Sequence, residues 1–264
     1  MNEAPAASFL GVPTEFRESV GSTNDELLRR AAAGAPEGLV LVADVQTSGR
    51  GRHGRSWWDA PGSSLLFSLL VRPSIPLPRF PLLGIAMACA VADAGSDAAG
   101  VLLGVKWPND VLHAGRKLCG ILAEARPGRA GGVPNGHFLV IGVGINVNQR
   151  AEELPDELRD RATSLRIAAG GRSLDRRTLL AAVLAGFDNY RRLALEQGAE
   201  ALRTALLPRL PAPGARLVVQ TADRRVEGIV EEILETGAIL MRDDAGTRIP
   251  IVAGEIPLGL GASE

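Results

Sequence analysis

The sequence predicts an α/β (α+β) protein in which a large domain of strands and packed helices precedes a small β-barrel. With 264 residues, of which 46% are hydrophobic, the chain can bury a sizeable core and suits one large domain with a small appendage. Short apolar runs of strand length alternate with runs of helical period along most of the chain. A segment rich in proline then gives way to four closely spaced strand-like runs, which is typical of a small barrel.

The N-terminal segment predicts a helix whose first turn is exposed. Residues from Met1 to Pro13 are expected to be frayed, and structure is expected to begin near Phe16. Ser22 or Thr23, followed by acidic residues and a leucine-containing helical run, fits an N-cap. Two interpretations stay open here: a cap alone, or a helix start whose hydroxyl and free N–H groups bind a polar ligand.

The most informative stretch is the loop from Gln46 to Trp58, which follows a predicted buried strand from Leu39 to Val45. Its glycines alternate with cationic side chains, so the backbone can approach a ligand while guanidinium groups converge on it. This pattern suits an anion such as phosphate, but an arginine–glycine tether for nucleic acid or a solvated basic loop would use the same residues. The glycines are Gly49, Gly51 and Gly54, and the cations are Arg50, Arg52, His53 and Arg55.

The next two elements are predicted to form the centre of the large domain. Ser63 to Val71 is an uninterrupted apolar run of strand length, which indicates a central strand. After a proline-punctuated connection, Leu82 to Ala94 is rich in alanine and leucine over helical length and predicts a buried helix that covers the sheet. Its Met87 is expected to be a core residue.

The stretch from Val101 to Glu124 predicts a strand, a tight turn and a further strand. Pro108 interrupts a regular ladder, so the two residues after it are expected at a bend where side chains can face a cavity. A lysine on either side of this bend favours a binding site, whereas an Asx turn with two surface lysines explains the same residues. The residues concerned are Lys106, Asn109, Asp110 and Lys117.

Phe138 to Val147 predicts another buried strand, which contains Gly142, Gly144 and Asn146. A dinucleotide-binding fingerprint would need a third glycine and a helix start after Gly144, and both are missing. The glycines are instead expected to let the strand lie close to something flat. Farther along, Leu154 to Ala169 predicts a helix-and-turn segment, and the longest amphipathic pattern predicts a packing helix over Asp175 to Gln197.

A domain boundary is predicted at Leu207 to Gly214, where prolines and a glycine cluster. We therefore expect a flexible N-terminus at residues 1–15, a main domain at residues 16–210 and a small barrel at residues 211–264. The strand-like runs that predict the barrel are Ala215–Gln220, Arg225–Ile233, Ala238–Arg242 and Thr247–Val252.

Composition argues against several classes of protein. Lys and Arg total 29 against 30 Asp and Glu, so the net charge of -1 gives no global attraction to nucleic acid or to an anionic membrane. Cys89 and Cys119 form no metal-type or redox pair, which predicts core thiols in a reducing, cytoplasmic compartment. No signal peptide is expected, and no apolar run approaches the roughly 20 residues needed to cross a bilayer.

An ordered set of motifs along nearly the whole chain resembles the bacterial biotin-protein ligases, also called biotin-[acetyl-CoA-carboxylase] ligases. The resemblance implies a catalytic domain with helices packed on a mixed sheet, followed by an SH3-like barrel. It also implies that biotin and ATP give biotinyl-5'-AMP and pyrophosphate, and that the biotinyl group then passes to a lysine of a biotin carboxyl carrier protein or domain. The motifs are Ser22-Thr23-Asn24, Gln46, Gly49 to Arg55, Lys106 to Asp110, Arg116 to Leu122, Gly142 to Asn146 and Gly254-Glu255-Ile256.

The same resemblance implies roles for individual residues. Polar groups at the helix start and at the strand end hold the ureido and thiophene end of biotin, and apolar strand residues line its tail. The glycine- and arginine-rich loop closes over biotin and the adenylate, and a bound anion should order it. Asn146 is expected to contact adenine. The implied binding residues are Ser22, Thr23, Asn24, Gln46, Gly49, Arg50, Gly51, Arg52, Lys117 and Asn146.

Three residues are the candidates for catalysis. Lys117 and Arg52 match groups that offset the negative charge that builds up when the biotin carboxylate attacks phosphorus. Asp110 is hypothesised to be the base or the orienter for the acceptor lysine, which must lose a proton before it attacks the mixed anhydride. Mg2+ is expected with ATP, carried mainly by the phosphates, and the sequence names no protein metal ligand.

Some members of the family carry an N-terminal DNA-binding domain, and too few residues precede Ser22 to form one. We therefore expect a monofunctional ligase, without operator or membrane binding, that is a monomer or a weak homodimer. The competing hypotheses are a lipoate or octanoate ligase, an RNA-binding protein and an inactive biotin sensor. The complete loop and the Lys106 to Asp110 motif favour biotin, the lack of interleaved aromatic residues argues against RNA, and intact Lys117 and Arg52 argue against an inactive sensor.

Overall fold

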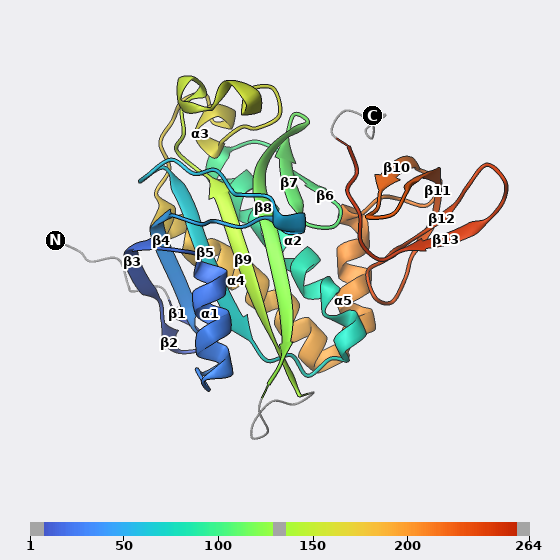
Figure 1. Cartoon of the computed structure of the whole chain (residues 1–264), viewed down its shortest axis with the longest axis horizontal. Coiled ribbons are helices and arrows are strands. Elements are labelled where there is room, and N and C mark those ends of the chain that lie inside the picture. Colours follow the sequence, from blue (N-terminus) through green and yellow to red (C-terminus); the bar gives the residue numbers. More distant parts are fainter. Residues whose placement is uncertain (1–7, 129–135, 258–264) are drawn as a thin grey trace.

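The computed structural model describes residues 8–128 and 136–257, which form two main β-sheets and several helices (Figure 1). The larger sheet has seven strands in the order β3-β4-β5-β9-β8-β7-β6. β3 and β4 are parallel, and the other neighbouring strands are antiparallel, so the sheet is mixed as predicted. The strands are β3 (Glu15–Val20), β4 (Val40–Gln46), β5 (Ser64–Val71), β6 (Gly104–Lys106), β7 (Asp110–His113), β8 (Arg116–Pro127) and β9 (His137–Asn146).

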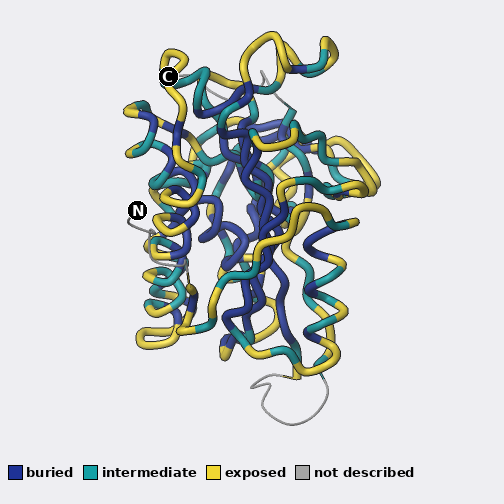
Figure 2. The backbone as a smooth tube through the Cα atoms, turned by 90° about the vertical axis from the view of Figure 1, so that its left-hand side faces the viewer, coloured by how far each residue is buried: buried dark blue, intermediate teal, exposed yellow. Residues whose placement is uncertain are grey.

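Helices cover both faces of this sheet, and Figure 2 shows its buried strands lying between them. On one face, Leu27 of α1 packs with Leu41 and other strand residues in a small apolar cluster. On the opposite face, Val42 and Phe67 belong to the main core, together with residues of α2 and α4. The alternation of strand side chains therefore serves two cores at once. The helices are α1 (Thr23–Ala32), α2 (Pro81–Ala99), α3 (Leu165–Ala168), α4 (Arg176–Gln197) and α5 (Ala199–Leu206), and the 3-10 turns are η1 (Arg52–Gly54), η2 (Leu77–Arg79), η3 (Ala151–Glu153), η4 (Asp156–Leu158) and η5 (Leu207–Arg209).

The prediction that structure begins near Phe16 is wrong. Strands β1 (Ser8–Phe9) and β2 (Val12–Pro13) pair as a short hairpin before β3. Phe9 is buried, and its ring centroid lies 6.0 Å from that of Phe187 in α4. An aromatic pair of this kind stabilises the hairpin through a contact that local sequence cannot reveal, since the two rings come from opposite ends of the large domain.

The core helix α2 is longer than its predicted extent, Leu82 to Ala94. By length and composition the segment Leu77–Ala99 could cross a bilayer, so the expectation that no apolar run has that length is wrong. Most of its side chains are buried in the protein, against α4 and the sheet. Met87 is fully buried, as predicted. The apolar composition of α2 is therefore explained by two packed surfaces.

Both cysteines are buried and free, as predicted. Cys89 lies in α2 and Cys119 in β8, within the same core. Burial raises the pKa of the Cys89 thiol to about 12 and also raises that of Cys119, because a thiolate is poorly solvated in apolar surroundings. These thiols are structural.

The C-terminal residues form a four-stranded antiparallel sheet of the SH3-like type, in the order β10-β11-β12-β13. It lies at one end of the large sheet (Figure 1). Trp107 is buried at this junction, and its indole N–H donates to the Gly237 carbonyl at 2.9 Å. Within two residues, all four strands agree with the predicted runs. They are β10 (Arg216–Gln220), β11 (Arg225–Ile233), β12 (Ile239–Arg242) and β13 (Arg248–Ile251).

Candidate active site

An open cleft lies over the large sheet, beside the N-terminal end of α1. Its floor follows from the alternation of β9. Phe138 and Val140 pack beneath α1, and Gly142 and Gly144 continue the same face without side chains. The face of β9 is therefore covered by apolar side chains beneath α1, and it forms the floor of the cleft from Gly142 onward, where side chains are absent.

The start of α1 forms one end of the cleft. Ser22 is the N-cap, and its hydroxyl accepts from the Asp25 N–H at 3.4 Å. The Oε1 atom of Gln46 accepts from the Thr23 N–H at 2.8 Å and lies 3.1 Å from the Thr23 hydroxyl. The cap is confirmed at Ser22, and Ser22, Thr23 and Gln46 also line the cleft. Binding of a polar ligand by this helix start stays a prediction.

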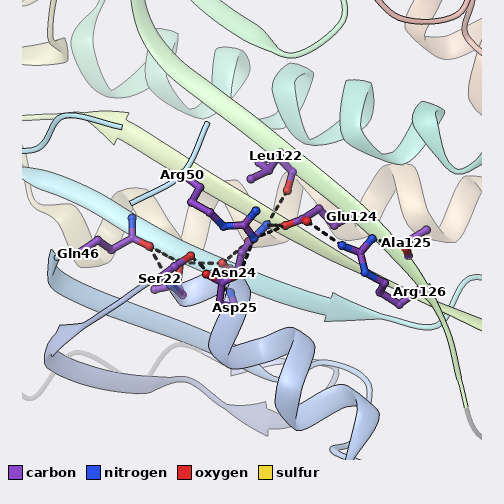
Figure 3. A network of polar contacts seen from close by, with 11 residues as sticks. Ser22, Asn24, Asp25, Gln46, Arg50, Leu122, Glu124, Ala125 and Arg126 are labelled. Carbon is purple, nitrogen blue, oxygen red and sulfur yellow. Dashed lines mark hydrogen bonds and ion pairs between the residues drawn. The ribbon is translucent and has the colours of Figure 1, made fainter. Parts of the chain in front are cut away.

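Asn24 is buried beside these residues and is held from several directions (Figure 3). Its Nδ2 donates to the Leu122 carbonyl at 3.1 Å and to Glu124 Oε2 at 3.0 Å. Its Oδ1 lies 2.6 Å from the Ser68 hydroxyl. Any side chain at position 142 would overlap the Asn24 amide, so Gly142 is required for this packing.

The flat group expected near the glycines of β9 is the indole of Trp57. A Cβ at Gly144 would lie 2.6 Å from this ring, and one at Gly120 would lie 2.9 Å from it. Gly120 and Gly144 are paired across β8 and β9, so the ring rests on a patch of bare backbone. Lys117 Nζ lies 5.7 Å from the ring centroid, a cation–π distance. The sequence interpretation did not single out Trp57, although it lies in the loop that was identified.

Each of three loop arginines contacts a different part of the molecule. Arg50 pairs with Asp25 and with Glu124, whereas Arg55 pairs with Glu255 at 2.8 Å. Arg52 donates to Asn109 Oδ1 at 2.8 Å and to the Gly254 carbonyl at 3.2 Å, and both acceptors are neutral. The loop is thus folded across the cleft and held against α1, β8 and the C-terminal segment.

The electrostatic environments of these arginines differ. Burial acts to lower the pKa of Arg50, but the carboxylates of Glu124 and Asp25 outweigh it and raise that pKa. For Arg52, burial dominates and lowers the pKa, although the charge of Asp110 opposes this. Within residues 8–128 and 136–257, Arg52 forms no ion pair, so its charge is the least compensated among the three loop arginines.

A charged cluster faces Arg52 from the start of β7. Asp110 is buried, and its carboxylate lies 2.6 Å from Lys117 Nζ and 3.5 Å from Lys106 Nζ. The bend predicted around Pro108 is present, and Asn109 faces the cleft, as expected there. Asp110 therefore fixes the position of Lys117, whose ammonium group faces the cleft.

The structure brings nearly all the predicted site residues to this one cleft. Gly49 lies behind the lining, with the Gln46 side chain and the Trp57 carbonyl against it. Asn146 also lies outside the lining: it is buried, and its amide donates to the Thr163 carbonyl at 3.0 Å. The predicted residues that line the cleft are Ser22, Thr23, Asn24, Gln46, Arg50, Gly51, Arg52, Asp110 and Lys117.

The arrangement suits an elongated ligand with a neutral polar head and an anionic end. The head would meet the hydroxyl and amide groups beside α1, and the anion would meet Arg52 and Lys117. In the part of the chain that the structure describes, no group of three or more His, Cys, Asp or Glu side chains is placed to hold a metal ion. The charged side chains that line the cleft include Arg50, Arg52, Arg55 and Lys117 together with the carboxylates of Asp110 and Glu255.

Comparison with known proteins identifies similar chains. Residues 17–146 match the model of the biotin/lipoate A/B protein ligase family. The chain is 36% identical to the biotin-[acetyl-CoA-carboxylase] ligase of Mycobacterium tuberculosis, over 89% of this chain and 85% of that protein. Biotin protein ligase from Aquifex aeolicus, solved with biotin and ATP, superposes with a TM-score of 0.77 at 28% identity, over 94% of this chain and 99% of the other. The Leishmania major enzyme solved with biotinyl-5-AMP gives 0.50 at 25% identity, over 91% and 98%.

Proposed function

The chain belongs to the biotin/lipoate A/B protein ligase family, and we propose that it is a biotin-[acetyl-CoA-carboxylase] ligase. The enzyme activates biotin with ATP as biotinyl-5'-AMP and transfers the biotinyl group to a lysine of a biotin carboxyl carrier protein or domain. The observation that carries this proposal is the cleft itself. It places a neutral hydrogen-bonding end and a cationic end within one pocket, as the two ends of biotin require.

We infer that the ureido and thiophene end of biotin binds beside the start of α1. Thr23, Asn24 and Gln46 offer hydroxyl and amide groups that can both donate and accept, as a ureido ring requires. Ser22 supports them by capping the helix. Leu122 lies on the cleft face of β8 and suits the aliphatic tail, whereas Ile121 and Val143 border the cleft through their backbone because their side chains lie in the main core.

The carboxylate of biotin and the α-phosphate of ATP would then meet between Arg52 and Lys117. Oxygen attack on phosphorus increases negative charge at this point, and fixed cations stabilise that charge without reorganising. Arg52 is suited to this role because both of its hydrogen-bond acceptors are neutral, which leaves its charge for an anion. Lys117 is held in position by Asp110. The protein forms no covalent intermediate in this scheme.

The loop supports both ends of the ligand. Arg50 and Gly51 line the cleft, and Gly49 lies behind them where the loop turns back toward Trp57. A backbone hydrogen bond of 2.9 Å from the Trp57 N–H to the Gly49 carbonyl closes the loop at its base. Glycine at these positions lets the loop backbone approach the ligand, which would exclude water from the mixed anhydride.

The second half-reaction needs a deprotonated acceptor lysine. We propose Asp110 as the residue that orients this amine or accepts its proton. The two lysines around its carboxylate favour orientation, because the carboxylate is already paired with both of them. The predicted contact of Asn146 with adenine stays a prediction, since Asn146 lies behind the cleft wall.

Mg2+ would enter with the nucleotide and be held mainly by its phosphates. The carboxylates nearest the cationic end are Asp110 and Glu255, and each is already paired with a lysine or an arginine. This donor set fits a metal carried by the substrate. We also propose that residues 16–210 form the catalytic domain and that residues 211–264 form an SH3-like domain, which reaches the cleft through Glu255.

The test is a single-turnover reaction without any carrier. Pure protein is mixed with biotin, Mg2+ and ATP, and bound biotinyl-5'-AMP is sought by mass spectrometry, with lipoate and octanoate in parallel. Formation of an adenylate with biotin, but not with lipoate or octanoate, supports the proposal. Later transfer of the biotinyl group to an added carrier domain completes the reaction. Activation of lipoate or octanoate in place of biotin would overturn the substrate assignment, and activation of none of them would overturn the enzymatic assignment.

A further inference from the structure

One carboxylate oxygen joins Asn24, at the proposed biotin end of the cleft, to Arg50 of the glycine- and arginine-rich loop. Glu124 Oε2 accepts from Asn24 Nδ2 at 3.0 Å and from Arg50 Nη2 at 2.9 Å (Figure 3). The second oxygen, Oε1, pairs with Arg126 at 3.2 Å on the outer side. The Glu124 side chain is 13% exposed and that of Arg126 is 54% exposed, so Arg126 lies on the solvent side of this carboxylate.

On one side, this oxygen determines how Asn24 presents its amide. The two ends of an asparagine amide have nearly the same shape and differ in that one donates and the other accepts. Because Glu124 Oε2 and the Leu122 carbonyl both accept, they hold the Nδ2 end. The Oδ1 end is consequently directed toward Ser68. Glu124 thus fixes the orientation of a group at the proposed biotin end.

On the other side, the same oxygen holds the first arginine of the loop. Arg50 reaches across from the loop to Glu124 on β8 and to Asp25 in the first turn of α1. The remaining arginine contacts of the loop lie farther along, where Arg52 and Arg55 contact the C-terminal segment. Arg50 is therefore the loop arginine that pairs with the wall beside α1.

Resting on the function proposed above, we propose that Glu124 is a positioning residue that couples occupancy of the biotin end to closure of the loop. A ligand that hydrogen-bonds to Asn24 fixes that amide and, through it, the shared Oε2 atom. An ordered Oε2 then holds Arg50 more firmly, and the loop closes over the reacting groups. Glu124 touches neither phosphate nor the reacting carboxylate in this account and acts through Asn24 and Arg50.

The experiment measures how long the enzyme retains biotinyl-5'-AMP and how well its loop resists trypsin. The variants are Glu124→Gln, Arg50→Met and the double variant, each checked for folding by thermal unfolding. We expect each single variant to release the adenylate about fivefold faster, the size typical of losing one partly exposed ion pair. The double variant should release it no faster than Arg50→Met alone, because Arg50→Met already breaks the link that Glu124→Gln breaks. Biotin should protect the wild-type loop from trypsin and the Glu124→Gln loop less.

Arg126→Ala is the matched control. It removes the other ion pair of the same carboxylate, lies outside the cleft and should retain adenylate at the wild-type rate. Wild-type retention by Glu124→Gln, or effects of the two changes that multiply in the double variant, would overturn the inference while leaving the proposed function intact. If Glu124→Gln does not fold, Glu124→Asp, which keeps the charge but shortens the side chain, takes its place, and wild-type retention by that variant would overturn the inference. A wild-type protein that forms no adenylate overturns both proposals.

Discussion

The indole of Trp57 packs directly on the backbone of Gly144, where even a methyl group would come within 2.6 Å of the ring. The contact joins the loop to β9 at the floor of the cleft. It also explains why two paired positions of β8 and β9, Gly120 and Gly144, are both glycine. A pair of bare backbone positions gives a planar ring a surface on which to lie.

Gly144→Ala should therefore disturb the loop and the fold together. Overpacking at a filled site costs about 1–3 kcal/mol, and the ring can escape this cost only by lifting the loop away from the floor. We expect a lower midpoint of urea unfolding and faster loss of bound adenylate. Gly104→Ala is the control, since open space surrounds that position. If Gly144→Ala has the same urea midpoint and the same rate of adenylate loss as this control, the contact between Trp57 and Gly144 contributes neither to stability nor to retention of the adenylate.

Replacing Lys117 should affect the first half-reaction. Lys117→Met removes an ammonium group that faces the cleft, and we expect adenylate formation to slow about 100-fold or more, as on loss of one electrostatic stabiliser. Lys106→Met is the comparison, because Lys106 contacts the same carboxylate from outside the cleft lining. The rate of pyrophosphate release measures adenylate formation by both variants. Equal slowing of adenylate formation by the two variants would mean that this step depends on the total charge around Asp110 and not on the position of Lys117.

Asp110→Asn separates the two half-reactions. If the carboxylate orients or deprotonates the acceptor lysine, transfer to a carrier should slow about 100-fold, within the range for a lost acid–base group, while adenylate formation slows less. Transfer is followed from preformed, enzyme-bound adenylate, and adenylation from pyrophosphate release. Identical losses in both steps would restrict Asp110 to holding Lys117 in position.

The contact between Arg55 and Glu255 should depend on pH. The hydrogen bond from Arg55 holds the pKa of Glu255 below its usual value of 4.5, despite partial burial that acts to raise it. A carboxyl group with a depressed pKa stabilises the folded state above the unfolded pKa and loses that contribution as pH falls through the folded value. Wild type should therefore have a higher Tm than Glu255→Gln at pH 6, and the two values should converge below pH 4.5. A difference in Tm that does not change with pH would contradict this assignment.

The sequence alone predicts most strands of the fold correctly, but it misses the N-terminal β1–β2 hairpin and the end of α2. Continuous apolar runs such as Ser64–Val71 are unambiguous because the strand is buried on both faces. The β1–β2 hairpin is missed because Phe9 is stabilised by Phe187, far along the chain. The predicted helix stops at Ala94, whereas α2 continues to Ala99, with Gly95 packed against Leu103 from the segment that follows the helix.

For the site, the motifs identify the residues but not their connections. Arg50 and Arg52 could be chosen from sequence because their loop pattern suits an anion, and Lys117 because it matches a motif of the family that the sequence resembles. Glu124 could not, because its role depends on the strand alternation that places it on the same face as Gly142 and near Asn24. Such a role arises from pairing between distant segments, and no local pattern carries it.

The hydrogen bond from Arg52 to the Gly254 carbonyl spans 202 residues of chain. During synthesis the loop leaves the ribosome 202 residues before its anchor does. Arg52, the arginine proposed to act in catalysis, consequently lacks this hydrogen bond on a nascent polypeptide, even after the large sheet has folded. We expect the nascent chain to retain the reactive adenylate only once Gly254 has emerged and joined Arg52.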